Sequence, residues 1–361
     1  MIIKEVRATR LRIPFVEQPL MLKNYTRPRE FVVVDIETKS GISGMGFVIF
    51  LGSGSATVKA CIEEMMAPQI IGRDATEVEG IWRSLWQSTQ SVGRMGVTMF
   101  AMSAIDIALW DIVGKKAGMP LHRLWGHCRD EIPVYGSGCW RGLGGEGMAE
   151  KAKAYIAEGF KAIKMQVGHM YTDRQDVANV RTVRDAVGPD IDIMIDVNQA
   201  WTADRAILVG RKIEEHDIFW LEEPVVASDF PGYLRIAEAL DIRIVGGENH
   251  YTRWDLRPFF ENPRIPILQP DVARGGLTEL RKIAAVADTF GMTMAPHHFP
   301  ELMVQLMASI PNGQILEYMD WFADLFIDPP RPKDGMMRPS ELPGHGLSIN
   351  PDILRDYRLT A

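Results

Sequence analysis

The spacing of apolar residues divides the 361-residue chain into two parts with different periodicities. Before about residue 124, apolar positions alternate in runs such as MIIKEVRATRLRIP, FVVVDIET and GISGMGFVIF, which is typical of strands. Apolar residues then recur at helical spacing, which predicts helices over Ser55 to Met66, Glu77 to Gln87 and Val97 to Lys115. We therefore predict an α+β unit over residues 1–124.

After residue 125, short apolar strands alternate with amphipathic helices such as Asp173 to Val187. Strands in this rhythm run parallel through right-handed crossovers, and eight of them close a barrel. A doubly wound open sheet is the alternative, but YGSGCWRG after the first strand lacks the spacing of a phosphate-binding loop. The eight predicted strands are Ile132–Ser137, Ala162–Val167, Ile191–Val197, Phe219–Glu222, Arg243–Gly247, Ile267–Asp271, Thr293–Pro296 and Ile315–Tyr318.

Composition and charge narrow the class of protein. The chain is 46% hydrophobic and 24% charged, as in ordinary globular proteins, and its net charge of −7 argues against nucleic acid as a partner. No run approaches the roughly 20 apolar residues of a membrane span, and the N-terminal run alternates, unlike a signal peptide. We expect a cytoplasmic protein with a small-molecule partner and no membrane association. The three cysteines, Cys61, Cys128 and Cys139, lack the number and spacing of disulfide frameworks or zinc sites.

Three carboxylates follow three consecutive predicted strands. Asp196, Glu222 and Glu248 are spaced 26 residues apart, which is one strand-helix repeat. The carboxyl ends of barrel strands form the face on which active sites are built, so these side chains should converge. Without a cation they would repel one another, and three oxygen ligands without His or Cys favour Mg²⁺ over zinc.

Two further groups of polar residues flank this set. Lys164 and Gln166 lie two apart on the second strand, so both side chains should point into the barrel mouth. Asp271 ends strand six and His297 ends strand seven, where a carboxylate would fix the imidazole tautomer and raise its basicity. We prefer His297 to its neighbour His298 for this dyad. Glu317 ends strand eight and would donate a hydrogen bond if protonated.

With these residues the chain resembles the enolase superfamily, in the mandelate racemase subgroup, over essentially its whole length. The resemblance implies an α/β fold, a modified (β/α)7β barrel of TIM type over residues 125–325. It also implies an N-terminal α+β capping domain over residues 1–124, completed by residues 326–361. Site residues implied by the resemblance are the Mg²⁺ ligands Asp196, Glu222 and Glu248, the dyad His297 and Asp271, the strand-two Lys164, the acid Glu317 and the active-site Asn198.

One position departs from the family pattern. Gln166 stands where the family has the second lysine of Lys-x-Lys, which is the base on one face of the substrate. Glutamine cannot take a proton, although it can hydrogen-bond a substrate hydroxyl. A two-base racemase is therefore disfavoured, and the prediction is a lyase that dehydrates an aldonate or aldarate. In this mechanism His297 takes the proton next to the carboxylate, an enediolate forms, and loss of the β-hydroxyl gives a 2-keto-3-deoxy acid.

The sequence leaves alternative functions open. A racemase, epimerase or cycloisomerase of a carboxylic acid on the same scaffold is the second choice, and an inactive paralogue that only binds metal or ligand is a different class. Specificity should come from the cap, through lids at Phe15 to Tyr25 and Gly52 to Ser55. Further substrate contacts are expected from Trp140, Arg141 and Tyr25, and a homo-oligomer is expected.

Overall fold

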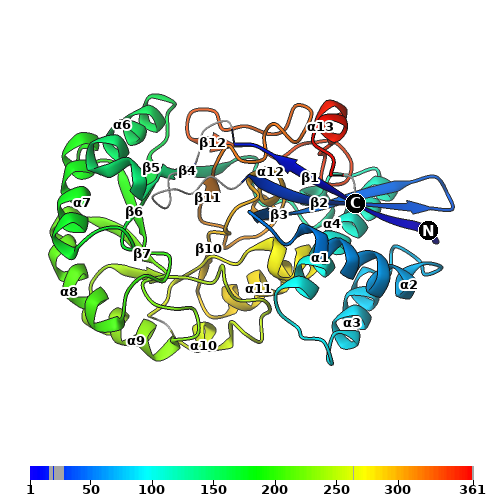
Figure 1. Ribbon diagram of the computed structural model, residues 1–361, viewed down its shortest axis with the longest axis horizontal. Helices are drawn as coiled ribbons and strands as arrows, with labels where there is room; N and C mark the ends of the chain where they lie inside the picture. Colours follow the sequence, from blue (N-terminus) through cyan, green and yellow to red (C-terminus); the bar gives the residue numbers. More distant parts are fainter. Residues whose placement is uncertain (16–18, 20–27, 263, 360–361) are drawn as a thin grey trace.

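The structure is a computed structural model that describes residues 1–15, 19, 28–262 and 264–359, shown in Figure 1. Its N-terminal part is an antiparallel sheet in the order β1-β2-β3, formed by β1 (Ile3–Ile13), β2 (Arg29–Thr38) and β3 (Ser43–Leu51). Gly44 and Gly46 of β3 lie against the main chain of helix α4, where a Cβ atom would collide with carbonyl oxygens of that helix. Glycine therefore lets the sheet and the helix approach closely.

The helices of this part begin close to the predicted positions. The predicted helix from Ser55 begins as α-helix but continues as a π-helical segment, which carries i→i+5 hydrogen bonds and differs from the expectation. The elements are α1 (Ser55–Ala60), η1 (Cys61–Met66), α2 (Ala67–Ile70), α3 (Val78–Ser88), α4 (Val97–Ala117) and α5 (Leu121–Leu124).

Helix α4 is the central helix of the cap. It is long and apolar enough by composition to cross a membrane, yet 78% of its most hydrophobic window is buried inside the fold. It packs on β3 and on the barrel helix α11 (Gly276–Thr289). Asp106 of α4 accepts hydrogen bonds from the main-chain nitrogen (2.8 Å) and Oγ1 (2.5 Å) of Thr278, so it satisfies an N-terminal donor of α11. Its length and composition are thus those of a buried core helix.

All eight predicted barrel strands are present and run parallel (Figure 1). A bridge between Gly246 and Leu268 joins β8 to β9, and a bridge between Met294 and Gly313 links β10 to the segment before β11. The ring is closed because β11 pairs with β4. The strands are β4 (Ile132–Cys139), β5 (Ala162–Gln166), β6 (Asp192–Asp196), β7 (Ile218–Glu222), β8 (Arg243–Val245), β9 (Ile267–Leu268), β10 (Thr293–Met294) and β11 (Leu316–Tyr318).

Strands β9 and β10 are shorter than predicted. Pro270 and Pro296 lie within the predicted spans and have no N–H group to donate to a neighbouring strand. Only a single bridge between Asp271 and His297 continues the pairing beyond the prolines. This bridge places the two residues side by side at the mouth of the barrel.

Helices cover the outside of the barrel (Figure 1). Helix α7 has the predicted bounds, because Thr172 and Gln175 form a capping box at its start and Gly188, with φ 78°, follows its end. The helices are α6 (Gly144–Ala157), α7 (Asp173–Val187), α8 (Ala203–Ile213), α9 (Phe230–Ala239), α10 (Arg257–Phe260), α11 and α12 (Pro300–Met307), with short 3-10 helices η2 (Arg141–Leu143), η3 (Glu214–His216) and η4 (Val272–Arg274).

The interior of the barrel is a packed layer of apolar side chains and not a channel. Its members are at most 2% exposed: Tyr135, Ala162, Met194, Trp220, Val245, Ile267 and Ala295. Such a layer supports polar side chains at the carboxyl ends of the strands above it.

The C-terminal segment contacts both parts of the chain. β12 (Met336–Met337) pairs antiparallel with β4 at the barrel, and after α13 (Pro351–Asp356) a bridge joins Arg358 to Leu11 of β1. Between them, the buried His345 donates from Nε2 to the Met45 carbonyl oxygen (2.8 Å), and its main-chain nitrogen donates to Asp111 Oδ1 (3.2 Å). The observed fold is the predicted α/β barrel with an N-terminal cap. The domain boundaries themselves stay a prediction.

Candidate active site

A cavity of about 300 Å³ lies between the carboxyl ends of the barrel strands and the cap. Its barrel side is polar, whereas its cap side is formed mainly by apolar residues, among them Phe50, Leu51 and Phe100. Most of the residues predicted for the site line this one cavity: Lys164, Gln166, Asp196, Asn198, Glu248, Asp271, His297, Glu317 and Trp140.

The three predicted metal ligands are buried at neighbouring strand ends. Asp196 ends β6 and is the register partner of Glu222, which ends β7, and Glu248 follows β8 by three residues. Burial raises the pKa of Glu222 to about 7, with Asp196 and Glu317 adding to the rise and Lys164 opposing it. Burial also raises the pKa of Glu248 to about 7, opposed by His297 and reinforced by Asp196 and Glu222. Repulsion between these carboxylates thus adds to the cost of burying them, and an oxygen-only donor set of this kind suits a hard divalent cation.

Glu222 is fixed by three donors from beneath the cavity. Lys164 Nζ donates to Oε1 (2.7 Å), while Trp220 Nε1 (3.0 Å) and Gln269 Nε2 (2.7 Å) both donate to Oε2. A carboxylate has about four acceptor positions, so one position, on Oε1, remains for a cation. Trp220 and Gln269 are not among the residues predicted for the site. Trp220 could have been found, because it lies two residues before Glu222 on the same strand and must face the same way.

The neighbouring Glu223 is held apart from this set. Its carboxylate accepts hydrogen bonds from Gln199 Nε2 (2.9 Å) and Asn249 Nδ2 (2.9 and 3.0 Å). Burial and the charge of Glu248 raise its pKa to about 8. Of the two consecutive glutamates, only Glu222 is bound to Lys164, which itself lines the cavity.

Asn198 connects the acid cluster to Arg141. Its main chain has φ 46°, and it donates to Asp196 through its main-chain nitrogen (2.8 Å) and through Nδ2 (2.5 Å). The Arg141 guanidinium donates to Asn198 Oδ1, and its side chain is not among those that line the cavity. Arg141 therefore contacts Asn198 and does not itself line the cavity, so it would act on a substrate only through Asn198.

Lys164 lies between two carboxylates. Its Nζ is 2.7 Å from Glu222 Oε1 and 2.7 Å from Glu317 Oε1. Burial alone would lower the pKa of Lys164, but these two charges hold it well above its ordinary value. Burial would likewise raise the pKa of Glu317, yet Lys164, His297 and His298 bring it well below its usual range. These charges favour an ionised Glu317, and the expectation that Glu317 donates a hydrogen bond when protonated stays a prediction.

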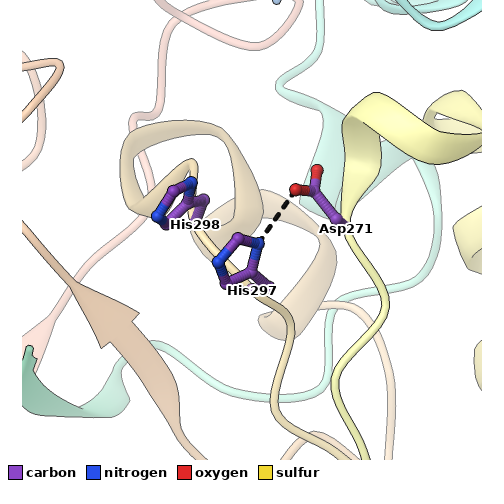
Figure 2. A group of neighbouring side chains, drawn as sticks. All are labelled: Asp271, His297 and His298. Atoms are coloured by element: carbon purple, nitrogen blue, oxygen red, sulfur yellow. Dashed lines mark hydrogen bonds and ion pairs between the residues drawn. The ribbon is translucent and has the colours of Figure 1, made fainter. Parts of the chain in front are cut away.

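Asp271 and His297 are in contact, as Figure 2 shows. Asp271 Oδ2 is 2.9 Å from His297 Nδ1, and Glu248 Oε2 is 3.4 Å from His297 Nε2. Burial would lower the pKa of His297, but Glu248 and Asp271 raise it to about 10. The ring of His298 stacks on His297, with centroids 3.7 Å apart and planes at 19°. These three residues are spaced closely enough to share a metal, but parallel rings direct their in-plane lone pairs side by side and not onto one ion.

The remaining predicted contacts are distributed around the cavity. Gln166 Oε1 is buried without a hydrogen-bond partner, and Trp140 stacks on Trp321 with ring centroids 5.5 Å apart. Of the predicted lid Gly52 to Ser55, Ser53 lines the cavity. Tyr25 and most of the predicted lid from Phe15 lie outside the described residues.

Comparisons with known proteins agree with this geometry. Residues 7–126 match the family model of the mandelate racemase / muconate lactonizing enzyme N-terminal domain, and residues 147–353 match the enolase C-terminal domain-like model. The chain is 33% identical to a 3,6-anhydro-alpha-L-galactonate cycloisomerase of Streptomyces coelicolor, over 96% of this chain and 97% of that protein. It is 32% identical to an L-talarate/galactarate dehydratase of Salmonella typhimurium, over 91% of this chain and 83% of that protein.

Solved structures give the same relationship. A racemase from Streptomyces coelicolor with bound magnesium superposes with a TM-score of 0.94 at 32% identity, over 99% of this chain and all of that one. An L-talarate dehydratase from Polaromonas, in complex with Mg and L-glucarate, superposes with a TM-score of 0.90 at 30% identity, over 99% and 98%. The chain therefore belongs to the enolase superfamily, among the relatives of mandelate racemase and muconate lactonizing enzyme.

Proposed function

We propose that this protein is a Mg²⁺-dependent lyase that removes the proton next to the carboxylate of a sugar acid and eliminates the oxygen at C3. The observation that carries the proposal is the Asp271–His297 dyad in the same cavity as Asp196 and Glu248, with Glu222 buried next to Asp196. Relatives named as dehydratases of talarate or galactarate, arabinonate and rhamnonate support an aldonate or aldarate as substrate.

The proposed metal ligands are Asp196, Glu222 and Glu248. Related structures that contain magnesium support this assignment, as does the one free acceptor position on Glu222. Mg²⁺ bound there would offset the negative charge that grows on the substrate carboxylate as the proton leaves C2.

The protein's own residues supply the remaining chemistry. His297 takes the C2 proton at Nε2, because Nδ1 is held by Asp271. Glu248 is the largest cause that raises the pKa of His297, and Mg²⁺ on Glu248 would offset that charge and bring the pKa back toward the range of a base. Lys164 contributes a fixed positive charge beside the enediolate, and Gln166 hydrogen-bonds a substrate hydroxyl through its unpaired oxygen. As the C3–O bond breaks, the protonated His297 returns the proton to the departing oxygen. Water leaves, and the enol becomes a 2-keto-3-deoxy acid.

The asymmetry of the site favours elimination over racemisation. A racemase needs a group that exchanges protons on each face of the substrate, and Gln166 occupies the strand-β5 side where that group would stand. Lys164 on the same strand is bound to two carboxylates and keeps its proton. An inactive paralogue is disfavoured because the dyad and Lys164 are both in place.

A cycloisomerase is the second candidate, and it is favoured by the 33% identity to the Streptomyces coelicolor cycloisomerase over nearly the whole of both chains. The two reactions share their bond changes. In a 3,6-anhydro acid the oxygen at C3 is a ring ether, so loss of the C2 proton and cleavage of C3–O opens the ring. The oxygen stays attached at C6 and no water is released.

A substrate screen with metal control tests the proposal. Metal-free protein is incubated with and without Mg²⁺ with galactarate, L-talarate, arabinonate and 3,6-anhydro-L-galactonate, and 2-keto products are measured. We expect a product from at least one acid, lost with excess chelator and restored by Mg²⁺. Full activity in excess chelator, or interconversion of C2 epimers, would refute the assignment.

We further propose that the protein is cytoplasmic and homo-oligomeric and that its partner is a small carboxylate. The proposal is supported by relatives named as enzymes of small sugar acids. Sedimentation analysis of purified protein tests the oligomeric state, and a monomer across the working concentration range would contradict it.

A further inference from the structure

His298 lies in the cavity wall directly beside the proposed base, yet it takes no part in the Asp271–His297 dyad (Figure 2). Its main-chain nitrogen donates to Glu317 Oε2 (3.0 Å), and its ring packs face to face on His297 and edge to face on Trp321, with ring centroids 5.1 Å apart. The ring is thus fixed in position next to the reacting end of the cavity.

The main chain at His298 has an unfavourable conformation that supports this placement. His298 and Phe299 have φ of 55° and 54°, in the left-handed region that non-glycine residues rarely adopt. Backbone strain of this kind persists where the surrounding structure enforces it, and it is concentrated at functional sites. Two such residues in succession turn the chain sharply between β10 and α12.

The ring nitrogens of His298 are available to a ligand. Within the described part of the chain neither nitrogen has a hydrogen-bond partner, and neither belongs to the polar atoms that are sealed from solvent. Burial and the adjacent His297 lower the pKa of His298 to about 3, so the imidazole is neutral and carries one N–H donor and one acceptor. A fixed neutral donor with no protein partner is suited to hydrogen-bond a substrate oxygen.

We propose that His298 is a second catalytic residue, which donates its N–H to the oxygen that leaves C3. The proposal rests on the proposed function and assigns proton transfer to His297 and stabilisation of the leaving oxygen to His298. The departing oxygen is two bonds from the carbon that loses its proton, so its partner must stand immediately beside the base. His298 meets that condition, since its ring centroid is 3.7 Å from that of His297.

The proton balance is unchanged by this residue. The C2–H bond breaks and its proton passes to His297, the C3–O bond breaks, and the same proton is returned from His297 to the oxygen. His298 gains and loses no proton. Its hydrogen bond strengthens as negative charge develops on the oxygen, so it stabilises the transition state of C3–O cleavage more than the bound substrate.

Deuterium exchange separates the two steps. The acid that the wild-type protein converts, from galactarate, L-talarate, arabinonate and 3,6-anhydro-L-galactonate, is incubated in D₂O with wild type, His298→Phe and His298→Asn. Incorporation of deuterium at C2 of recovered substrate and formation of 2-keto product are both followed by NMR. Phenylalanine keeps the ring stack without a donor, whereas asparagine keeps a donor. His127→Asn, an exposed histidine outside the cavity, is the control.

We expect His298→Phe to slow product formation by about 10²-fold, as for loss of one oxyanion donor, while C2 exchange persists and comes to exceed it. His298→Asn should recover part of the product rate. Product formation at the wild-type rate, or exchange and product falling by the same factor, would overturn the role of His298. Absence of both exchange and product in the wild type with all four acids would instead overturn the proposed function on which it rests. Unchanged Mg²⁺ affinity and thermal midpoint identify variants that are properly folded.

Discussion

Replacing Trp220 by phenylalanine should weaken Mg²⁺ binding, although the Trp220 indole is buried below the cavity and does not line it. Its Nε1 donates to Glu222 Oε2 at 3.0 Å, and within the described residues Gln269 is the only other donor to that oxygen. The substitution keeps an aromatic ring in the barrel layer but removes the donor. Glu222 then loses orientation and becomes easier to protonate, so that a metal ion must compete with a proton.

The magnitude follows from the kind of hydrogen bond that is lost. Hydrogen bonds to charged groups contribute about 1.5–3 kcal/mol. Because about 1.4 kcal/mol corresponds to tenfold in affinity, the Kd for Mg²⁺ should rise by about 10- to 100-fold. The same range is typical of residues that support metal ligands from behind. Once the site is saturated, kcat should return to within a few-fold of wild type, because Trp220 does not line the cavity.

Calorimetric titration of metal-free protein with Mg²⁺ measures this change directly. Trp82→Phe is a matched control, since Trp82 is also buried and its Nε1 donates to the Gly275 carbonyl oxygen at 2.8 Å, away from the carboxylates. We expect the control to bind Mg²⁺ like wild type. Equal Kd values for wild type and Trp220→Phe, with both folded, would show that the donor to Glu222 contributes nothing to metal binding.

Three further predictions concern the base, the opposite face and the cap. His297→Asn should reduce C2 exchange in D₂O by about 10²- to 10⁴-fold with the fold intact, and wild-type exchange in this variant would exclude His297 as the base. Wild type should exchange only one C2 epimer, and Gln166→Lys should add exchange of the other; comparable wild-type exchange of both epimers would contradict a single base. Burial raises the pKa of Asp106 from 3.8 to about 7, so its contribution to stability is fully present below about pH 4 and is lost as pH rises through about 7. Thermal midpoints should therefore fall less between about pH 5 and 8 in Asp106→Asn than in wild type, and parallel curves would refute this.

Much of the fold could be predicted from local sequence patterns. The bounds of α7 agree with the prediction because a capping box and a glycine mark its ends. Hydrophobic spacing could not distinguish α- from π-helical turns over Cys61–Met66, since both bury similar positions in so short a segment. The predicted spans of β9 and β10 were too long, because the prediction followed the apolar runs through Pro270 and Pro296. These prolines have no N–H group to donate to a neighbouring strand.

In the candidate site, too, some residues could be predicted from local sequence patterns and others could not. Strand-end position alone brought Asp196, Glu222 and Glu248 to attention, because parallel strands present their carboxyl ends on one face. The charge of Glu317 was not predictable, since it depends on a 2.7 Å contact with Lys164, whose strand β5 is separated from β11 by β4. Gln269 was missed because its bond to Glu222 joins residues 47 apart in sequence and follows no short motif.

The closure of the cap by the last residues of the chain has a consequence for synthesis. Met45 and His345, which meet in the cap, are 300 residues apart in sequence. At about 5–20 residues per second, a ribosome needs about 15–60 s to make the chain between them. Until residue 345 is made, the Met45 carbonyl of β3 and the Asp111 side chain lack their C-terminal partners, and until α11 is made, α4 lacks the barrel helix on which it packs. A chain released after the barrel strands but before residue 345 would contain every proposed metal ligand but lack the C-terminal residues that complete the cap. We therefore expect nascent chains to keep these buried polar groups unsatisfied until residue 345 has been made.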